Sequence, residues 1–138
     1  MASVTYRNAH PIVYTEDLGR ALAFYRDRLG FEQTFQFPPE GEAVFVALAL
    51  GPSELSLADI TGPDEGAHGR PLRPVSGHRF EICIYASDVD AAVADLRTAG
   101  APVLKEPADQ PWGERMAYVA DPDGNPVMIC APLDRPGS

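Results

Sequence analysis

The 138-residue chain has few basic residues, and this shortage narrows its range of partners. It carries 11 Lys and Arg against 20 Asp and Glu, a formal net charge of −9. Nucleic acids and anionic lipid surfaces are bound largely through basic side chains that neutralise phosphate. The composition therefore predicts neither nucleic acid nor membrane as a partner, whereas a cationic small molecule would be attracted by long-range steering.

Long apolar runs and a basic, apolar leader are also lacking. The chain begins MASVTYRNAHPIVYTED, and no run approaches the roughly 18 apolar residues that span a bilayer. We therefore expect a cytoplasmic protein. With 45% hydrophobic residues, one domain of this length can bury a core unaided.

Cysteine is scarce as well. Cys83 and Cys130 are the only two, and both stand in apolar, strand-like segments without metal-type spacing to each other. This pattern predicts reduced core thiols rather than a disulfide scaffold. The chain also lacks the G-x-S-x-G, G-x-G-x-x-G and phosphate-loop motifs, so we predict no catalytic residue.

Hydrophobic periodicity predicts a β-α-β-β-β order in the first half. A helix is expected from Asp17 to about residue 29, where Asp17 caps the first turn and Gly30 ends the helix in a left-handed conformation. One strand precedes the helix and three follow it, at residues 9–15, 31–37, 43–50 and 54–60.

Residues 61–78 are rich in glycine and proline, have no apolar periodicity and are predicted to be a linker. The same order restarts after them. A second helix is expected at 88–99, begun by a capping box of Ser87 and Asp90 and ended by Gly100. The strands of this half are expected at 79–86, 101–105, 115–120 and 125–131, and an Asp-Pro-Asp-Gly turn joins the last two.

The two halves of the sequence match at a constant offset in residue number. Asp17 and Asp88 each open a helix and lie 71 residues apart (88 − 17). The same offset pairs His10 with Glu81, Ile12 with Cys83, and Tyr14 with Tyr85. We infer an internal repeat, with modules at 8–60 and 79–132 inside a single domain that spans 1–138.

Three segments carry a resemblance to a known family: HPIVYTEDLGRALAFYRDRLGF, DVDAAVADLRTAGA and PWGERMAYVADPDGNPVMI. They resemble the vicinal oxygen chelate superfamily, which includes glyoxalase I, the extradiol dioxygenases and the bleomycin-resistance proteins. In character the chain is most similar to the bleomycin-resistance-like binding proteins. The resemblance implies an α+β fold in which two βαβββ modules in tandem form a cupped mixed sheet, with helices outside and a ligand cavity inside. It also implies a homodimer.

Strand alternation then assigns side chains to the two faces of the sheet. The first strand of the first module would present His10, Ile12 and Tyr14 to the cup, and the first strand of the second module would present Glu81, Cys83 and Tyr85. The opposite positions are apolar and should pack under the helices: Val13, Phe80, Ile82 and Ile84.

The resemblance also implies where a divalent metal would bind in an enzyme of this superfamily. His10 and Glu81 stand at two ligand positions, but the last expected Glu is Met128, whose thioether suits hard or borderline ions poorly. A further ligand could be Glu54 or Ser56, depending on register. We therefore expect no metal and no other cofactor. If a metal does bind, the ligand set would be His10, Glu81 and Glu54.

A binding role has more support in the sequence. Trp112 stands where a W-G segment lines the ligand groove of similar bleomycin-resistance-type proteins, although it could equally be a core or dimer-interface residue. The predicted ligand-binding residues are His10, Ile12, Tyr14, Phe37, Phe45, Glu81, Cys83, Trp112, Met116, Tyr118 and Met128.

Our first hypothesis is non-catalytic binding and sequestration of a small aromatic molecule, such as an antibiotic or other secondary metabolite. The alternative is a divalent-metal-dependent lyase, isomerase or dioxygenase of the glyoxalase superfamily. A plain interaction or regulatory module of the same fold is a third possibility.

Overall fold

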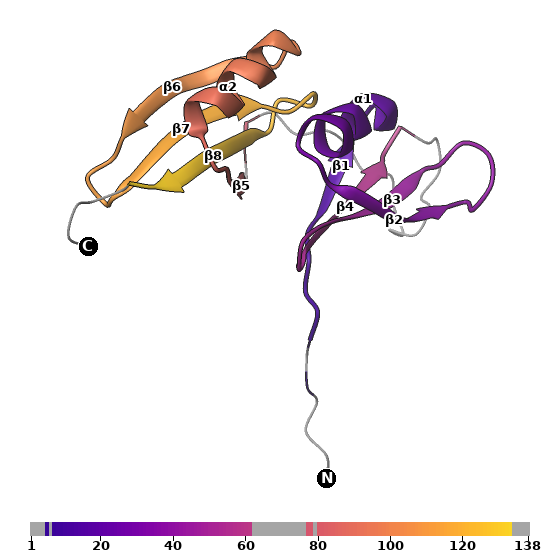
Figure 1. Cartoon of the computed structure of the whole chain (residues 1–138). Helices are drawn as coiled ribbons and strands as arrows, with labels where there is room; N and C mark the ends of the chain where they lie inside the picture. Colours follow the sequence, from indigo (N-terminus) through magenta and orange to yellow (C-terminus); the bar gives the residue numbers. More distant parts are fainter. Residues whose placement is uncertain (1–4, 6, 62–76, 79, 134–138) are drawn as a thin grey trace. The chain divides into compact units, whose positions relative to one another are not determined.

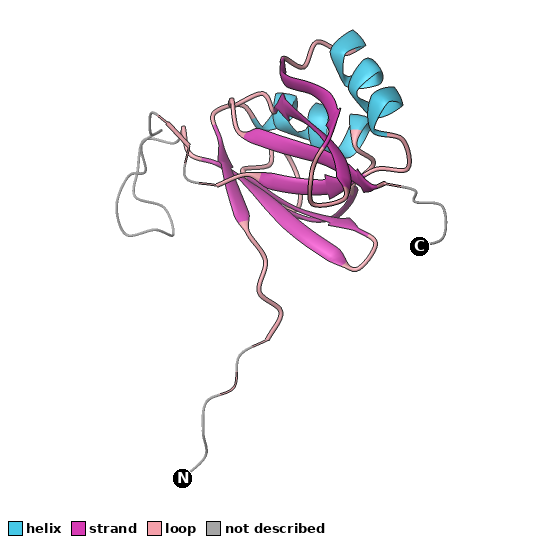
Figure 2. Cartoon of the chain, turned by 90° about the vertical axis from the view of Figure 1, so that its left-hand side faces the viewer, coloured by secondary structure: helices cyan, strands magenta, loops and turns pink. Residues whose placement is uncertain are grey.

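The computed structural model describes residues 5, 7–61, 77–78 and 80–133. The chain divides into two compact units, residues 1–73 and 74–138 (Figure 1). Most of the predicted linker lies outside the described residues. Strands dominate both units (Figure 2). Along the chain, the helical segments come between the first and the second strand of each unit.

Each unit contains a four-stranded mixed sheet. The first unit comprises β1 (Ile12–Thr15), α1 (Leu18–Leu22), the π-helical segment η1 (Ala23–Arg28), β2 (Glu32–Phe37), β3 (Phe45–Leu50) and β4 (Ser53–Asp59). The second comprises β5 (Ile82–Tyr85), α2 (Val89–Thr98), β6 (Val103–Asp109), β7 (Glu114–Ala120) and β8 (Pro126–Pro132).

The two sheets have the same topology. The strand orders are β1-β4-β3-β2 and β5-β8-β7-β6. In each sheet the first strand pairs in parallel with the last, and the other neighbours are antiparallel. This confirms the α+β class, the βαβββ order of both units and the inferred repeat. The second strand of the second half, predicted at 101–105, is β6 and is seven residues long.

The first helix is not the single α-helix that periodicity predicts. Asp17 caps it as expected, accepting a 3.1 Å hydrogen bond from the backbone N–H of Arg20. After Leu22 the chain widens into η1, where the Leu29 N–H donates to the Phe24 carbonyl five residues back. The wider turn accompanies the burial of two consecutive aromatic rings, Phe24 and Tyr25, whose centroids lie 5.0 Å apart edge to face.

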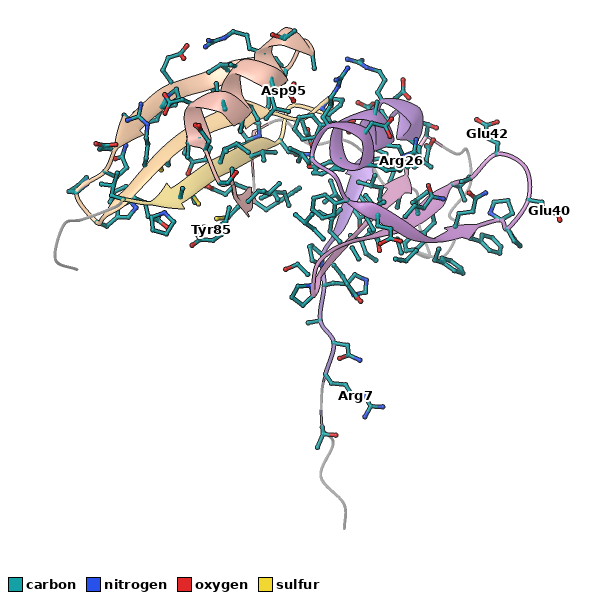
Figure 3. All side chains as sticks on the ribbon, viewed as in Figure 1. Arg7, Arg26, Glu40, Glu42, Tyr85 and Asp95 are labelled. Atoms are coloured by element: carbon teal, nitrogen blue, oxygen red, sulfur yellow. The ribbon has the colours of Figure 1, made fainter. Side chains whose placement is uncertain are left out.

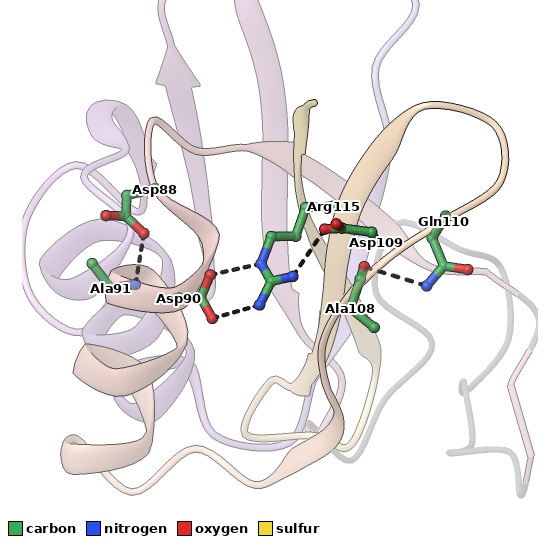
Figure 4. A network of polar contacts seen from close by, with 7 residues as sticks. All are labelled: Asp88, Asp90, Ala91, Ala108, Asp109, Gln110 and Arg115. Atoms are coloured by element: carbon green, nitrogen blue, oxygen red, sulfur yellow. Dashed lines mark hydrogen bonds and ion pairs between the residues drawn. The ribbon is translucent and has the colours of Figure 1, made fainter. Parts of the chain in front are cut away.

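The second helix begins one residue later than the predicted capping box requires. Its N-cap is Asp88, which accepts a 3.0 Å hydrogen bond from the Ala91 N–H, so the prediction of Ser87 as the cap is wrong. Asp90 instead receives two hydrogen bonds from Arg115, at 2.7 and 2.9 Å (Figure 4). These bonds lower the pKa of the Asp90 carboxyl. Arg115 also donates to Asp109 at 2.9 Å, so this guanidinium ties α2 to β6 and β7.

The core of each unit lies on the helix-facing side of its sheet, and the opposite side is here called the open face. On the helix-facing sides the buried apolar strand residues are Val13, Val46, Leu48, Leu55 and Leu57 in the first unit, and Ile84, Ala117, Val119, Val127 and Ile129 in the second. Two predictions of burial are wrong. Phe80 is 45% exposed because β5 begins only at Ile82, and Cys83 is exposed because its position alternates onto the open face. Cys130 is buried, as predicted.

Among the described residues, no helix has the length and apolar character that crossing a membrane requires.

Candidate ligand-binding face

The open face of the second sheet collects most of the chemistry-bearing residues that the sequence singled out. Side chains on this face alternate with the buried set that packs against α2. Cys83 and Tyr85 lie on it from β5, with Glu81 just before that strand. Its members from β7 and β8 are Glu114, Met116, Tyr118, Met128 and Cys130.

The pairing register fixes the neighbours on this face. Met128 lies beside Cys83 on one side and opposite Tyr118 on the other. Cys130 lies in the same way beside Tyr85 and opposite Met116. Met128 therefore stands in the middle of the face as a half-buried thioether.

A carboxylate lies towards each end of this face and accepts hydrogen bonds from aromatic side chains. At one end the Tyr118 hydroxyl donates to Glu81 Oε2 at 2.7 Å. At the other, Glu114 accepts a 3.3 Å bond from the Tyr85 hydroxyl at Oε2 and a 3.0 Å bond from Trp112 Nε1 at Oε1. One carboxylate thus orients two aromatic rings.

Both phenols are stabilised in the protonated form. The hydrogen bond to Glu81, reinforced by burial, raises the pKa of Tyr118 to about 12. The negative charge of Glu114 raises the pKa of Tyr85. Around neutral pH these groups therefore act as hydrogen-bond donors and leave the two carboxylates as the charged centres of the face.

The rings that Glu114 orients are open to solvent. The Tyr85 side chain is 65% exposed and that of Trp112 is 62% exposed. Figure 3 shows Tyr85 extending from β5 away from the helix of its own unit. Because large aromatic side chains are usually well buried, this exposure marks a surface suited to contact with another molecule.

The open face of the first sheet is more apolar. Phe37 pairs with Phe45 and is 56% exposed, and Phe35 contacts Phe45 edge to face at 6.2 Å between centroids. Ile12 and Tyr14 are also exposed on this face.

The register of the first sheet answers the question that the sequence left open about the further metal-ligand position. Ile12 pairs with Ser56, and therefore Glu54 and Ser56 both lie on the open face, two residues apart. Ser56 is buried, whereas Glu54 approaches His10, with 3.8 Å between His10 Nδ1 and Glu54 Oε2. Glu54 is thus the carboxylate available to His10.

The predicted site residues fall into separate groups. The first sheet brings His10 to Glu54, and the second brings Glu81, Cys83, Tyr118 and Met128 together. Sequence reasoning missed the sharing of Glu114 by Tyr85 and Trp112. The spacing of Trp112 and Glu114, two residues apart at a strand start, could have indicated a common face. No group of three or more His, Cys, Asp or Glu side chains placed to hold a metal occurs within the described ranges.

Comparisons with known proteins agree with this architecture. The family model described as "Glyoxalase/Bleomycin resistance protein/Dioxygenase superfamily" matches residues 7–129. The chain belongs to this superfamily. An uncharacterized protein of Mycolicibacterium smegmatis is 36% identical over 124 residues, which cover 90% of this chain and 92% of the relative.

Some of the similar proteins carry names of enzymes. The mitochondrial methylmalonyl-CoA epimerase of Bos taurus is 29% identical over 126 residues, which cover 91% of this chain and 66% of the epimerase. The solved structure of lactoylglutathione lyase from Agrobacterium tumefaciens matches with a TM-score of 0.67 at 27% identity, covering 92% of this chain and 94% of that one.

Superfamily membership directs attention to the metal-ligand positions. His10, Glu54 and Glu81 have the imidazole and carboxylate donors that divalent ions use. Met128 does not, and its neighbours on the sheet are a thiol and a phenol. Since a catalytic ion needs about three protein ligands, the donors of either described unit alone fall short of a complete set.

Proposed function

We propose that this protein binds a small, flat aromatic molecule on the open face of the second sheet and sequesters it without chemical change. The observation that carries the proposal is the pair of solvent-exposed rings, Tyr85 and Trp112, held by the single carboxylate of Glu114. Rings restrained in advance lose less side-chain entropy when a ligand stacks on them. Each aromatic contact contributes about 0.5–1.5 kcal/mol beyond the burial of area.

The charges of the face favour a ligand with a cationic group. Glu81 and Glu114 lie on this face, and the chain as a whole carries a net charge of −9. The half-buried thioether of Met128 adds an apolar surface that adapts to irregular shapes. These features support a planar, cationic antibiotic or other secondary metabolite as the ligand class.

We further expect a homodimer, the assembly that the family resemblance implies. Light scattering at micromolar concentration should give the mass of two chains, and the mass of one chain would contradict this expectation.

Titration of the intrinsic fluorescence tests the binding proposal, because Trp112 is the only tryptophan. We expect planar cationic compounds to quench it, and neutral compounds of the same ring size to bind more weakly. By calorimetry, Trp112→Ala should weaken binding about tenfold, which corresponds to ~1.4 kcal/mol.

Two variants separate stacking from charge. Glu114→Gln keeps one acceptor oxygen for the Trp112 N–H but removes the charge, so it should weaken the binding of cationic compounds more than that of neutral ones. Phe35→Ala, an exposed aromatic of the first sheet, is the matched control and should bind normally. Equal affinity of Trp112→Ala and the unmodified protein would defeat the proposal.

One observation favours the metal-dependent alternative, a lyase, isomerase or dioxygenase. It is the approach of His10 to Glu54 on the first open face. A divalent ion with His10 and Glu54 among its ligands would act as a Lewis acid on substrate oxygens. Elemental analysis of the purified protein decides between the functions. A stoichiometric divalent metal that is lost in His10→Ala would support the alternative and overturn the binding proposal.

A further inference from the structure

Four sulfur-containing side chains lie next to one another on the open face of the second sheet. Cys83 pairs in register with Met128, and Met116 pairs with Cys130. The two thiol sulfurs, Cys83 Sγ and Cys130 Sγ, are 3.7 Å apart. We propose that this sulfur cluster is a binding site for a soft, thiophilic metal ion of the Cu(I) type.

The separation of the thiols suits a shared metal ion. A disulfide requires a sulfur–sulfur distance of about 2.05 Å, and both cysteines are free thiols here. Two sulfurs that bind one tetrahedral ion at about 2.3 Å would lie about 3.8 Å apart. The observed spacing therefore needs almost no adjustment to accept an ion between the thiols.

The identity of the donors selects the class of ion. Thiolate and thioether sulfur are soft ligands, which favour Cu(I) over the harder ions Mg²⁺ and Mn²⁺. Met128 pairs in register with both Cys83 and Tyr118, so its thioether offers an additional soft donor on the same face. This site uses neither His10 nor Glu54, and it shares only Met128 with the metal-ligand positions considered above.

Access and charge are favourable for a cation. Cys83 is exposed and offers the point of entry, whereas Cys130, its diagonal neighbour on the same face, is buried. Glu81 and Glu114, towards the two ends of the face, attract positive charge. Each thiol that binds the metal gives up its proton to the solvent. Because burial raises the pKa of Cys130 to about 12, the ion must compete with that proton, and its affinity should increase with pH.

The test uses the reduced 138-residue chain under oxygen-free conditions. Cu(I) is added, and the protein competes for it with a chromogenic chelator. We expect one ion per chain, a thiolate-to-metal charge-transfer band in the ultraviolet, and release of protons into a weakly buffered solution. Cys83→Ser alters an exposed position and should fold normally, and it should bind Cu(I) at least about 100-fold more weakly. Met128→Leu, which conserves volume, should weaken binding about tenfold.

Controls keep this proposal separate from the ligand-binding function. Asp95→Asn removes an exposed carboxylate from α2 and should retain full Cu(I) affinity. Trp112→Ala should also retain it, whatever its effect on aromatic ligands. Absence of the charge-transfer band, or unchanged affinity in Cys83→Ser, would overturn the proposal. The proposal would also be overturned if the reduced protein took up no metal and lost the mass of two hydrogen atoms on oxidation, because the two thiols would then be a redox pair.

Discussion

The open faces of the two sheets differ far more than the sheets themselves. Both units share strand order, strand direction and an aspartate cap at the helix start. Yet the first face presents Phe35, Phe37 and one His–Glu pair, whereas the second presents two carboxylates, three aromatic hydrogen-bond donors and four sulfurs. The repeat therefore preserves what forms the fold, and the open face is where each unit acquires its own chemistry.

The hairpins that close the two sheets show the same contrast. In the first unit, β3 and β4 are joined by the exposed pair Gly51 and Pro52. In the second, the turn between β7 and β8 is built around Asp121, which is only 3% exposed. Its carboxylate accepts hydrogen bonds from the Asp123 N–H at 3.0 Å, the Asn125 N–H at 2.8 Å and the Asn125 side-chain amide at 2.9 Å.

Removing the Asp121 carboxylate should give the largest effect that we predict. Asp121→Ala leaves several donors without their charged acceptor, and we expect a loss of about 2–3 kcal/mol in the free energy of unfolding. Urea denaturation followed by circular dichroism measures it. Pro52→Ala, in the corresponding turn of the first unit, should change stability by no more than about 0.5 kcal/mol. If both variants lose the same amount, the two turns do not differ as the hydrogen bonds indicate.

The helix caps provide a test in which the units should behave alike. Asp17 and Asp88 occupy equivalent positions and each accepts one backbone hydrogen bond, at 3.1 and 3.0 Å. We expect Asp17→Ala and Asp88→Ala each to lower the free energy of unfolding by about 1 kcal/mol.

A conservative replacement sharpens the cap experiment. Asn accepts the same bond, so Asp17→Asn and Asp88→Asn should restore most of the loss. If the Ala variant lowers the free energy of unfolding at one position and not at the other, the two caps are equivalent in sequence but do not contribute equally to stability.

Local patterns were sufficient to predict the order of helices and strands, because caps, terminal glycines and strand alternation are local, whereas the fold itself was expected from the family resemblance. The 71-residue offset between the helix starts, the Asp17 cap, the positive φ of Gly30 and the end of the second helix before Gly100 are confirmed. Two local details were predicted wrongly. The buried rings of Phe24 and Tyr25 accompany the π-helical segment, and the N-cap falls on Asp88 rather than Ser87 because α2 begins at Val89.

The open faces were harder to predict, because neighbours on a face depend on pairing between distant strands. Alternation placed Cys83 and Tyr85 on one face, but no local pattern reveals that Cys83 approaches Cys130 or that Glu114 is shared by Tyr85 and Trp112. These contacts need the register of β5, β8 and β7. Sequence reasoning could therefore nominate the residues but not their partners.

The smallest predicted effect concerns the titration of Tyr118, whose hydroxyl donates to Glu81. Its pKa of about 12 lies above the ordinary value of 10.0, so the pair stabilises the fold fully below pH 10 and loses this contribution as the pH rises towards 12. Because Tyr118 is half-buried, solvent screens the pair and the change in stability should be slight.

Phenolate absorbance, taken as the difference between the unmodified protein and Tyr118→Phe, reports the pKa of Tyr118 directly. Glu81→Gln should lower it towards 10, whereas Glu54→Gln on the first sheet should leave it unchanged. If the pKa of Tyr118 stays the same in Glu81→Gln, the Glu81 carboxylate does not raise it, and the two open faces do not differ electrostatically at this end of the second sheet.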